Sequence, residues 1–256
     1  MSMTIIKLGG SLLTDKTVPY SFHEDILSRI GREIASYRQQ TSDPVLLVHG
    51  SGSFGHPVAQ QYETAKGFSD VQGAWGACLT HHAASQINQK VIAGLLQEDL
   101  PVVSVMPSAF LADSSGAWSV VDTILDQGLI PVLYGDVVWD KDRGCKIYSG
   151  ETIIDLMVRD CQSLWNITRI IHVGKEDGVY DNTGQVILEV TPEIMQTLTN
   201  LDSHGTDVTG GMLHKLSSSL VNAQQGLEVF IINGRVPDTL YQCLIGGDFS
   251  GSRIKG

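Results

Sequence analysis

The segment MTIIKLGGS, residues 3–11, indicates the fold class of this chain. Its short apolar run, Met3–Leu8, has the length of a buried strand, and Gly9-Gly10 ends it. The segment PVLLVHG at 44–50 repeats this arrangement, because a short apolar run again ends at glycine. Strands that are apolar on both faces are typical of parallel sheets covered by helices on both sides.

Helical patterns separate the short apolar runs along the rest of the chain. Isoleucines recur every four residues within Phe22–Arg38, which predicts an amphipathic helix. Further helices are predicted at Gly73–Gln97, Ala117–Gln127, Glu151–Leu164 and Gly211–Gln225, and further strands at Val102–Val105, Ile130–Tyr134, Arg169–Val173 and Glu228–Ile232. Turn sequences predict hairpins over 135–148 and 177–190. We therefore expect an α/β protein, a three-layer αβα sandwich with a mostly parallel central sheet and appended β-hairpins.

The composition suits a compact domain and narrows the range of partners. The chain has 256 residues, of which 42% are hydrophobic and 18% are charged, against a usual charged fraction of about 25%. With 17 Lys and Arg against 28 Asp and Glu, the formal charge is 17 − 28 = −11. This balance argues against a nucleic-acid or anionic membrane surface, which needs a basic patch. It does not exclude a small anionic ligand, because local charge can oppose net charge.

Cysteine usage and hydropathy predict a soluble cytoplasmic protein. The four cysteines, Cys78, Cys145, Cys161 and Cys243, lie far apart and form neither a metal-binding pair nor a disulfide framework. No stretch has the roughly 18 apolar residues of a membrane-spanning helix, and the first residues lack the apolar core of a signal peptide. We expect reduced thiols and a single domain of two lobes over residues 1–256.

The first of three glycine-rich segments is Lys7-Leu8-Gly9-Gly10-Ser11. Glycine lets backbone N–H groups approach an anion without a Cβ in the way, Ser11 adds a hydroxyl donor, and Lys7 adds a positive charge. The alternative is a plain turn at a strand end with a surface lysine.

The second segment, His49-Gly50-Ser51-Gly52-Ser53-Phe54-Gly55-His56, contains the spacing G-x-G-x-x-G. Asp70 follows Gly50 by 20 residues, as in a dinucleotide fingerprint. However, Asp70 lies in a polar stretch, whereas the acidic residue of that fingerprint ends a second apolar strand. We therefore favour a loop that wraps one phosphate, with His56 as a hydrogen-bond donor at its end, over a nicotinamide-dependent oxidoreductase.

The third segment is Thr209-Gly210-Gly211, with Lys215 four residues after Gly211. These residues are able to open a helix whose N-terminus points N–H donors at a phosphate, with the lysine one turn in on the same face. The alternative is a capped helix with an exposed lysine. Three phosphate-suited segments in one α/β chain are harder to dismiss than any one of them.

Together these motifs resemble the amino acid kinase superfamily. The resemblance rests on Lys-x-Gly-Gly-Ser at the start, the Gly-Ser-Phe-Gly-His segment, Asp-Gly-Val-Tyr at 177–180 and Asp-x-Thr-Gly-Gly-Met-x-x-Lys at 207–215. The second segment is similar to that of the isopentenyl phosphate kinases within the superfamily. The resemblance implies a homodimer that uses ATP with Mg²⁺ to phosphorylate isopentenyl phosphate. It also implies an acceptor-binding lobe over about 1–165 and a nucleotide-binding lobe over about 166–256.

The resemblance also implies a role for each matching residue. On the donor side, Lys7, Gly9, Gly10, Ser11, Gly52, Asp177, Gly211 and Lys215 would bind ATP. On the acceptor side, Ser51, Gly55, His56 and Gly150 would bind the substrate. Lys7, Lys16, His56 and Lys215 would form the catalytic set, with Lys16 stabilising the transition state, and no metal ligand is expected from the protein.

Two departures from the family pattern bear on this interpretation. Ser149-Gly150-Glu151-Thr152 stands where the family often has Ser-Gly-Asp-Asp, and Lys175-Glu176 interrupt its Thr-Asp-Val-Asp-Gly-Val-Tyr pattern. Two alternatives to the leading interpretation therefore remain open. One is a kinase of another small phosphate or phosphonate, such as fosfomycin. The other is a nucleotide or anion sensor without catalytic activity, built on the same fold.

Overall fold

An eight-stranded sheet forms the centre of the molecule, which is described by a computed structural model covering residues 1–112, 118–202 and 210–256. Across the sheet the strands are β10 (Glu189–Val190), β12 (Gly251–Ile254), β11 (Glu228–Asn233), β7 (Ile167–Gly174), β1 (Met3–Leu8), β2 (Val45–His49), β4 (Ile130–Tyr134) and β3 (Val102–Ser104). All neighbours pair in parallel except β11 and β12. The mostly parallel sheet is thus confirmed.

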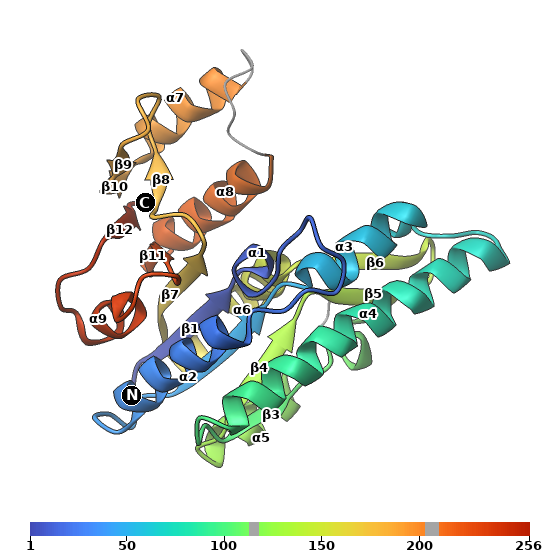
Figure 1. Cartoon of the computed structure of the whole chain (residues 1–256), viewed down its shortest axis with the longest axis horizontal. Helices are drawn as coiled ribbons and strands as arrows, with labels where there is room; N and C mark the ends of the chain where they lie inside the picture. Colours follow the sequence, from blue (N-terminus) through green and yellow to red (C-terminus); the bar gives the residue numbers. More distant parts are fainter. Residues whose placement is uncertain (113–117, 203–209) are drawn as a thin grey trace.

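Helices cover both faces of the sheet, which confirms the three-layer arrangement (Figure 1). One layer contains α1 (Gly10–Leu13), α2 (Glu24–Arg38), α4 (Val71–Leu96) and α9 (Thr239–Ile245), and the other contains α5 (Ser119–Asp126), α6 (Gly150–Trp165) and α8 (Gly210–Gln224). The remaining helices are α3 (Gly52–Gln61) and α7 (Pro192–Asp202). Alternate residues of β1 enter two separate apolar clusters: Met3 and Ile5 face α6, whereas Ile6 and Leu8 face α2.

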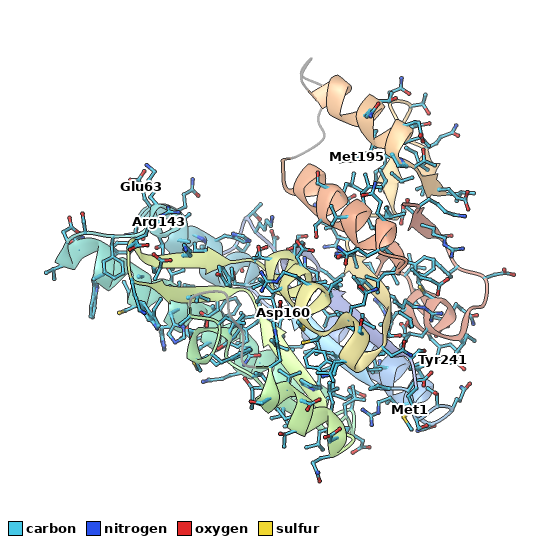
Figure 2. The ribbon with its side chains drawn as sticks, turned by 180° about the vertical axis from the view of Figure 1, so that it is seen from behind. Met1, Glu63, Arg143, Asp160, Met195 and Tyr241 are labelled. Carbon is cyan, nitrogen blue, oxygen red and sulfur yellow. The ribbon has the colours of Figure 1, made fainter. Side chains whose placement is uncertain are left out.

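Both predicted hairpins are present and extend away from the sheet. Strands β5 (Asp136–Asp140) and β6 (Gly144–Tyr148) pair antiparallel, as do β8 (Val179–Tyr180) and β9 (Val186–Ile187). Seen from behind, Glu63 and Arg143 lie together at the tip of the β5–β6 arm, whereas Met195 lies on the separate arm formed by α7 (Figure 2). The β5–β6 arm is held to the turn at Thr64–Lys66, because the Arg143 guanidinium donates to the carbonyl oxygens of Ala65 and Lys66.

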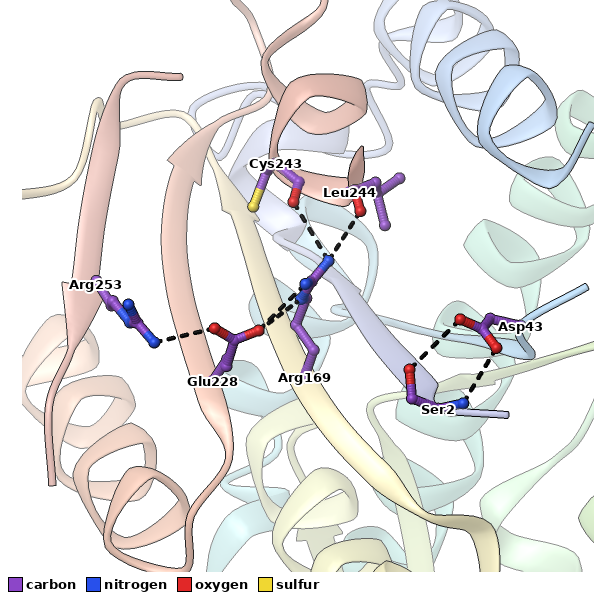
Figure 3. A network of polar contacts seen from close by, with 7 residues as sticks. All are labelled: Ser2, Asp43, Arg169, Glu228, Cys243, Leu244 and Arg253. Atoms are coloured by element: carbon purple, nitrogen blue, oxygen red, sulfur yellow. Dashed lines mark hydrogen bonds and ion pairs between the residues drawn. The ribbon is translucent and has the colours of Figure 1, made fainter. Parts of the chain in front are cut away.

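Charged side chains tie three strands of the sheet together near the amino end of β7. Arg169 on β7 and Arg253 on β12 both bind the carboxylate of Glu228, at 3.1 and 3.0 Å (Figure 3). Arg169 also donates to the carbonyl oxygen of Leu244 at the end of α9. This network lies at the amino ends of the parallel strands, opposite the carboxyl ends where the glycine-rich segments follow β1 and β2. None of the described helices has the length and apolar character needed to cross a membrane.

Candidate active site

The first two glycine-rich segments meet at the carboxyl ends of β1 and β2. A Cβ placed on Gly10 would lie 2.6 Å from the Gly52 backbone nitrogen, so only glycine permits this approach. Gly52 has a φ of +49°, and a Cβ there would lie 2.2 Å from Thr14 Oγ1. Thr14 Oγ1 in turn accepts a hydrogen bond from the Ser53 N–H at 2.9 Å. The two segments therefore form one continuous backbone surface.

The prediction that residues 49–56 form a loop was wrong beyond Ser51. Residues from Gly52 onward form α3, because their N–H groups bond back along the chain in helical fashion. The Gly55 N–H donates to the Ser51 carbonyl oxygen at 3.3 Å and the Gly9 N–H to the Val173 carbonyl oxygen at 2.8 Å, so neither is free for a ligand. Gly10 and Ser11 begin α1, where N–H groups lack intrahelical acceptors and can face an anion.

Lys7 forms a buried ion pair that the sequence interpretation did not include. Its Nζ lies 2.6 Å from Glu151 Oε1, with 8% and 14% of the two side chains exposed. Burial acts to raise the pKa of Glu151, but the charge and hydrogen bond of Lys7 outweigh it and bring that pKa to about 2. Lys7 is therefore no surface lysine. It is a cation held at the strand end by a carboxylate of the first turn of α6.

Gly150, predicted to face the substrate, begins α6 beside this pair. A Cβ on Gly150 would lie 3.3 Å from both Lys7 Cε and Val48 Cγ1, so a larger residue would press on the lysine. Ser149 caps the helix by accepting a hydrogen bond from the Thr152 N–H at 3.1 Å. The missing second aspartate of the family pattern is thus replaced by a threonine that supports the helix start.

Lys215 enters the same centre from α8, on the other side of the sheet from α3. Burial, followed by the positive charge of Lys7, lowers the pKa of Lys215 to about 8. The helix includes Gly210 and Gly211 at its start, as predicted, whereas the predicted Thr209 and Asp207 lie outside the described residues. Two lysines and one carboxylate thus form a buried charged centre, named the donor-side centre after the predicted ATP-binding residues in it: Lys7, Lys215 and Glu151.

His56 and Lys16 lie at the outer edge of the site and are exposed to solvent. Partial desolvation, then the charges of Lys16 and Lys7, lower the pKa of His56, which places all three side chains in one electrostatic neighbourhood. The segment that carries Lys16 is tied to α3, because the Tyr20 N–H donates to the Ser53 carbonyl oxygen at 3.3 Å. The structure thereby brings together residues 40 positions apart.

Asp177 lies at the same edge of the sheet but is already engaged. Its Oδ1 accepts a hydrogen bond of 2.7 Å from Asn233 Nδ2, and its Oδ2 accepts one of 3.1 Å from the Tyr180 hydroxyl. The carboxylate therefore shapes the turn after β7, and its predicted contact with a nucleotide stays a prediction. Asp70 caps α4 by accepting from the Gly73 N–H, which removes the observation that favoured a dinucleotide fold.

Two residues at this site were missed from the sequence, Glu151 and His172. His172 of β7 is the register partner of Lys7 and is 2% exposed. A common signal marks it, because Lys7, His49 and His172 each interrupt an apolar strand within two residues of a glycine. Glu151 has a weaker signal: a buried strand lysine needs an anion, and the first turn of a following helix is one place to supply it. Among the described residues, no three His, Cys, Asp or Glu side chains gather as metal ligands.

The comparisons with known proteins fit this geometry. The profile described as the Amino acid kinase family matches residues 2–233, and the chain belongs to that family. Isopentenyl phosphate kinases of Methanothermobacter thermautotrophicus and Methanocaldococcus jannaschii are 35% and 33% identical to it, covering 99% and 98% of both chains. A crystal structure of isopentenyl phosphate kinase at 31% identity superposes with a TM-score of 0.81, covering 99% of this chain and 100% of the other. The Thermoplasma acidophilum isopentenyl phosphate kinase product complex gives 0.80 at 25% identity, covering 99% and 100%.

Proposed function

We propose that this protein transfers the terminal phosphoryl group of ATP to isopentenyl phosphate, giving isopentenyl diphosphate and ADP. The proposal is carried by the buried centre of Lys7, Lys215 and Glu151, which lies beside the joined glycine segments in a chain that matches isopentenyl phosphate kinases from end to end. A preformed cationic centre of this kind suits the terminal phosphates of a nucleotide.

The chemistry needs positioning and charge stabilisation more than proton transfer. An oxygen of the acceptor phosphate forms a bond to the γ-phosphorus, the bond from that phosphorus to the bridging oxygen breaks, and ADP leaves with the electron pair. The attacking oxygen is already anionic, so no general base is required. The obstacle is the approach of two anions, which Lys7, Lys16 and Lys215 offset with positive charge.

Each site residue has a place in this scheme. Gly10 and Ser11 donate N–H groups to the ATP phosphates, with Gly9, Gly52 and Gly211 allowing close approach of the backbone. Lys7 and Lys215 bind the terminal phosphates, and Asp177 borders the nucleotide. Mg²⁺ bound with ATP would supply further charge neutralisation on the phosphates. The acceptor phosphate is bound by His56 and the Ser51 backbone, with Gly55 and Gly150 leaving room for it.

A panel of acceptors tests this function. ADP release is measured with isopentenyl phosphate, dimethylallyl phosphate, fosfomycin and a nucleoside monophosphate, each at several concentrations. We expect the highest kcat/KM with isopentenyl phosphate. Preference for fosfomycin would replace the proposed substrate, whereas tight ATP binding without ADP release for any acceptor would indicate a sensor.

We further propose that two copies associate and work in the cytoplasm. Val71 and Trp75 lie one turn apart at the start of α4 and are 86% and 61% exposed, which is unusual for large apolar side chains and suits a partner surface. All four cysteines are free thiols, which suits a reducing compartment. Sedimentation analysis tests the association. A dimer that Trp75→Glu dissociates is expected, and a monomeric wild type would refute the proposal.

A further inference from the structure

His172 is a polar side chain in a buried stretch of the central strand β7. It lies on β7 between Lys7 of β1 and Ile231 of β11, and it is 2% exposed. Its Nε2 lies 3.2 Å from Ser219 Oγ on α8, whereas Nδ1 is buried without a hydrogen-bond partner among the described residues. A buried nitrogen without a partner is unfavourable for folding, so this histidine calls for a functional explanation.

The bond to Ser219 lies one helical turn from Lys215. Residues four apart on a helix share a face, so Lys215 and Ser219 both point from α8 toward the sheet. Between the described residues of α8 and the sheet, the contact of Ser219 with His172 is the one side-chain hydrogen bond found. On its other side α8 is tied to α6, because Ser218 Oγ and Asn222 Nδ2 both donate to Asp155 Oδ1, at 2.6 and 3.0 Å.

We propose that His172 is a positioning residue for Lys215. Its hydrogen bond to Ser219 fixes α8 against β7 at the level where Lys215 reaches the space beside Lys7. This inference rests on the proposed function, in which both lysines bind the phosphates of ATP. Burial, together with the charges of Lys7 and Lys215, holds the pKa of His172 at about 3. The imidazole is therefore neutral at physiological pH and anchors the helix without adding a third positive charge.

A positioning role and a packing role make opposite predictions for His172→Leu. Leucine fills similar space and removes the unpartnered nitrogen, but it also leaves the buried Ser219 hydroxyl without its partner. These two effects on stability oppose each other, so the melting temperature should stay close to that of the wild type. If His172 only packs, ATP should then bind as before. If it positions Lys215, ATP affinity and transfer fall although the stability of the fold is nearly unchanged.

The experiment compares His172→Leu, Ser219→Ala and the double variant with the wild type. ATP binding is measured by titration calorimetry without acceptor, followed by kcat, both KM values and the melting temperature. We expect each single variant to lower kcat/KM for ATP about tenfold to a hundredfold, as displacement of a reacting group does, with the acceptor KM unchanged. The double variant should be no worse than the single ones, because both remove the same bond. His172→Gln, which keeps a hydrogen-bonding group, should recover part of the loss.

A matched control comes from the other side of the sheet. Thr80 and Thr64 form a buried hydroxyl pair at 3.0 Å between α4 and the turn Thr64–Lys66, neither of which carries a predicted site residue. Thr80→Val therefore removes a comparable bond and should leave ATP binding unchanged. Unchanged ATP affinity and kcat/KM in both Ser219→Ala and His172→Leu would overturn the proposal, as would additive losses in the double variant. If His172→Leu does not fold, Ser219→Ala decides alone. If the wild type binds ATP but does not phosphorylate isopentenyl phosphate, the proposed function fails while the ATP titrations still decide the role of His172.

Discussion

On the donor side of the site, Lys7 and Glu151 pair with 8% and 14% of their side chains exposed, whereas His56 and Lys16 on the acceptor side are open to solvent. The donor-side charges come from strand β1 and from helix α6, so the fold holds them before any ligand arrives. The acceptor-side groups come from the segment before α2 and from the first turns of α3. Under the proposed function, the nucleotide phosphates meet charges that the fold already holds in place, whereas the acceptor binds at an open edge.

The two buried histidines beneath the two sides differ in the polar neighbours of their ring nitrogens. His49, under the acceptor side, has an acceptor oxygen 3.1 Å from each ring nitrogen, the Gly50 carbonyl oxygen and Asn88 Oδ1, and its single N–H donates to one of them. His172, under the donor side, has only one engaged. Each ring nitrogen of His49 thus faces a polar atom, whereas Nδ1 of His172 faces none among the described residues, so the polar packing is less complete beneath the charged centre.

Removing Lys7 should have the largest effect and would break the donor side outright. Lys7→Ala deletes the cation proposed to contact the donor phosphates and leaves Glu151 buried without its partner. We expect kcat to fall about a thousandfold with any acceptor, and the free energy of unfolding to fall by about 3–5 kcal/mol. Coupled ADP release and denaturant unfolding measure the two effects. Normal turnover with either isopentenyl phosphate or dimethylallyl phosphate would contradict the assignment.

His56→Ala should break the acceptor side and spare the donor side. Desolvation and the charges of Lys16 and Lys7 lower the pKa of His56, and a protonated ring nitrogen is the proposed N–H donor to the acceptor phosphate in either charge state. Its loss should lower kcat/KM for isopentenyl phosphate about a hundredfold, with ATP affinity unchanged by calorimetry. His56→Asn, which keeps an N–H donor, is the matched variant and should retain more activity. Weaker ATP binding in His56→Ala would show that the two sides are not separable.

Glu151→Gln sharpens the comparison by removing the donor-side anion while keeping its shape. The variant leaves the Lys7 ammonium without its counter-ion, and we expect kcat/KM for ATP to fall about tenfold. It should also change acid stability. Because the folded pKa of Glu151 is about 2 and its unfolded pKa is about 4.3, the ion pair stabilises the fold above pH 4.3 and that contribution is lost toward pH 2. Melting temperatures from pH 5 to pH 2 should therefore fall less steeply in Glu151→Gln than in the wild type.

The sequence predicts most of this fold because its periodic signals are strong. The apolar runs at Met3–Leu8 and Ile130–Tyr134 match their strands residue for residue, and the helix predicted over Gly73–Gln97 begins two residues earlier at Val71 and ends at Leu96. Helix α3 was missed because glycines at 50, 52 and 55 and Pro57 are typical of loops. Tertiary contacts overrode that local preference, since Gly52 is fitted between Thr14 and Gly10.

The site was predictable in outline but not in its pairings. Lys7 and Lys215 stand in glycine-rich motifs, and those motifs identify them. Glu151 lies 144 residues from Lys7, and no local pattern reveals that a buried lysine and a helix-start carboxylate meet. The place of His172 beside Lys7 depends on the register of β7 against β1, and side-chain periodicity alone does not specify that register. Long-range partners of buried polar groups are therefore the part that needed the structure.

The smallest effect is expected from Lys215→Arg. This variant keeps the positive charge at position 215 and changes only the pH at which that charge is lost. With the pKa of Lys215 lowered to about 8 by burial and by Lys7, the wild type loses this cation as pH rises past 8. Its kcat/KM for ATP, which reports the free enzyme, should then fall toward tenfold per pH unit. Bound ATP favours the charged lysine, so the corresponding limb in kcat should lie at higher pH. Arginine stays protonated throughout, so the variant should lose modest activity below pH 8 but show no alkaline limb near 8. An identical limb in Lys215→Arg would assign that titration to another group and weaken the contrast between a charged, buried cradle and an open acceptor edge.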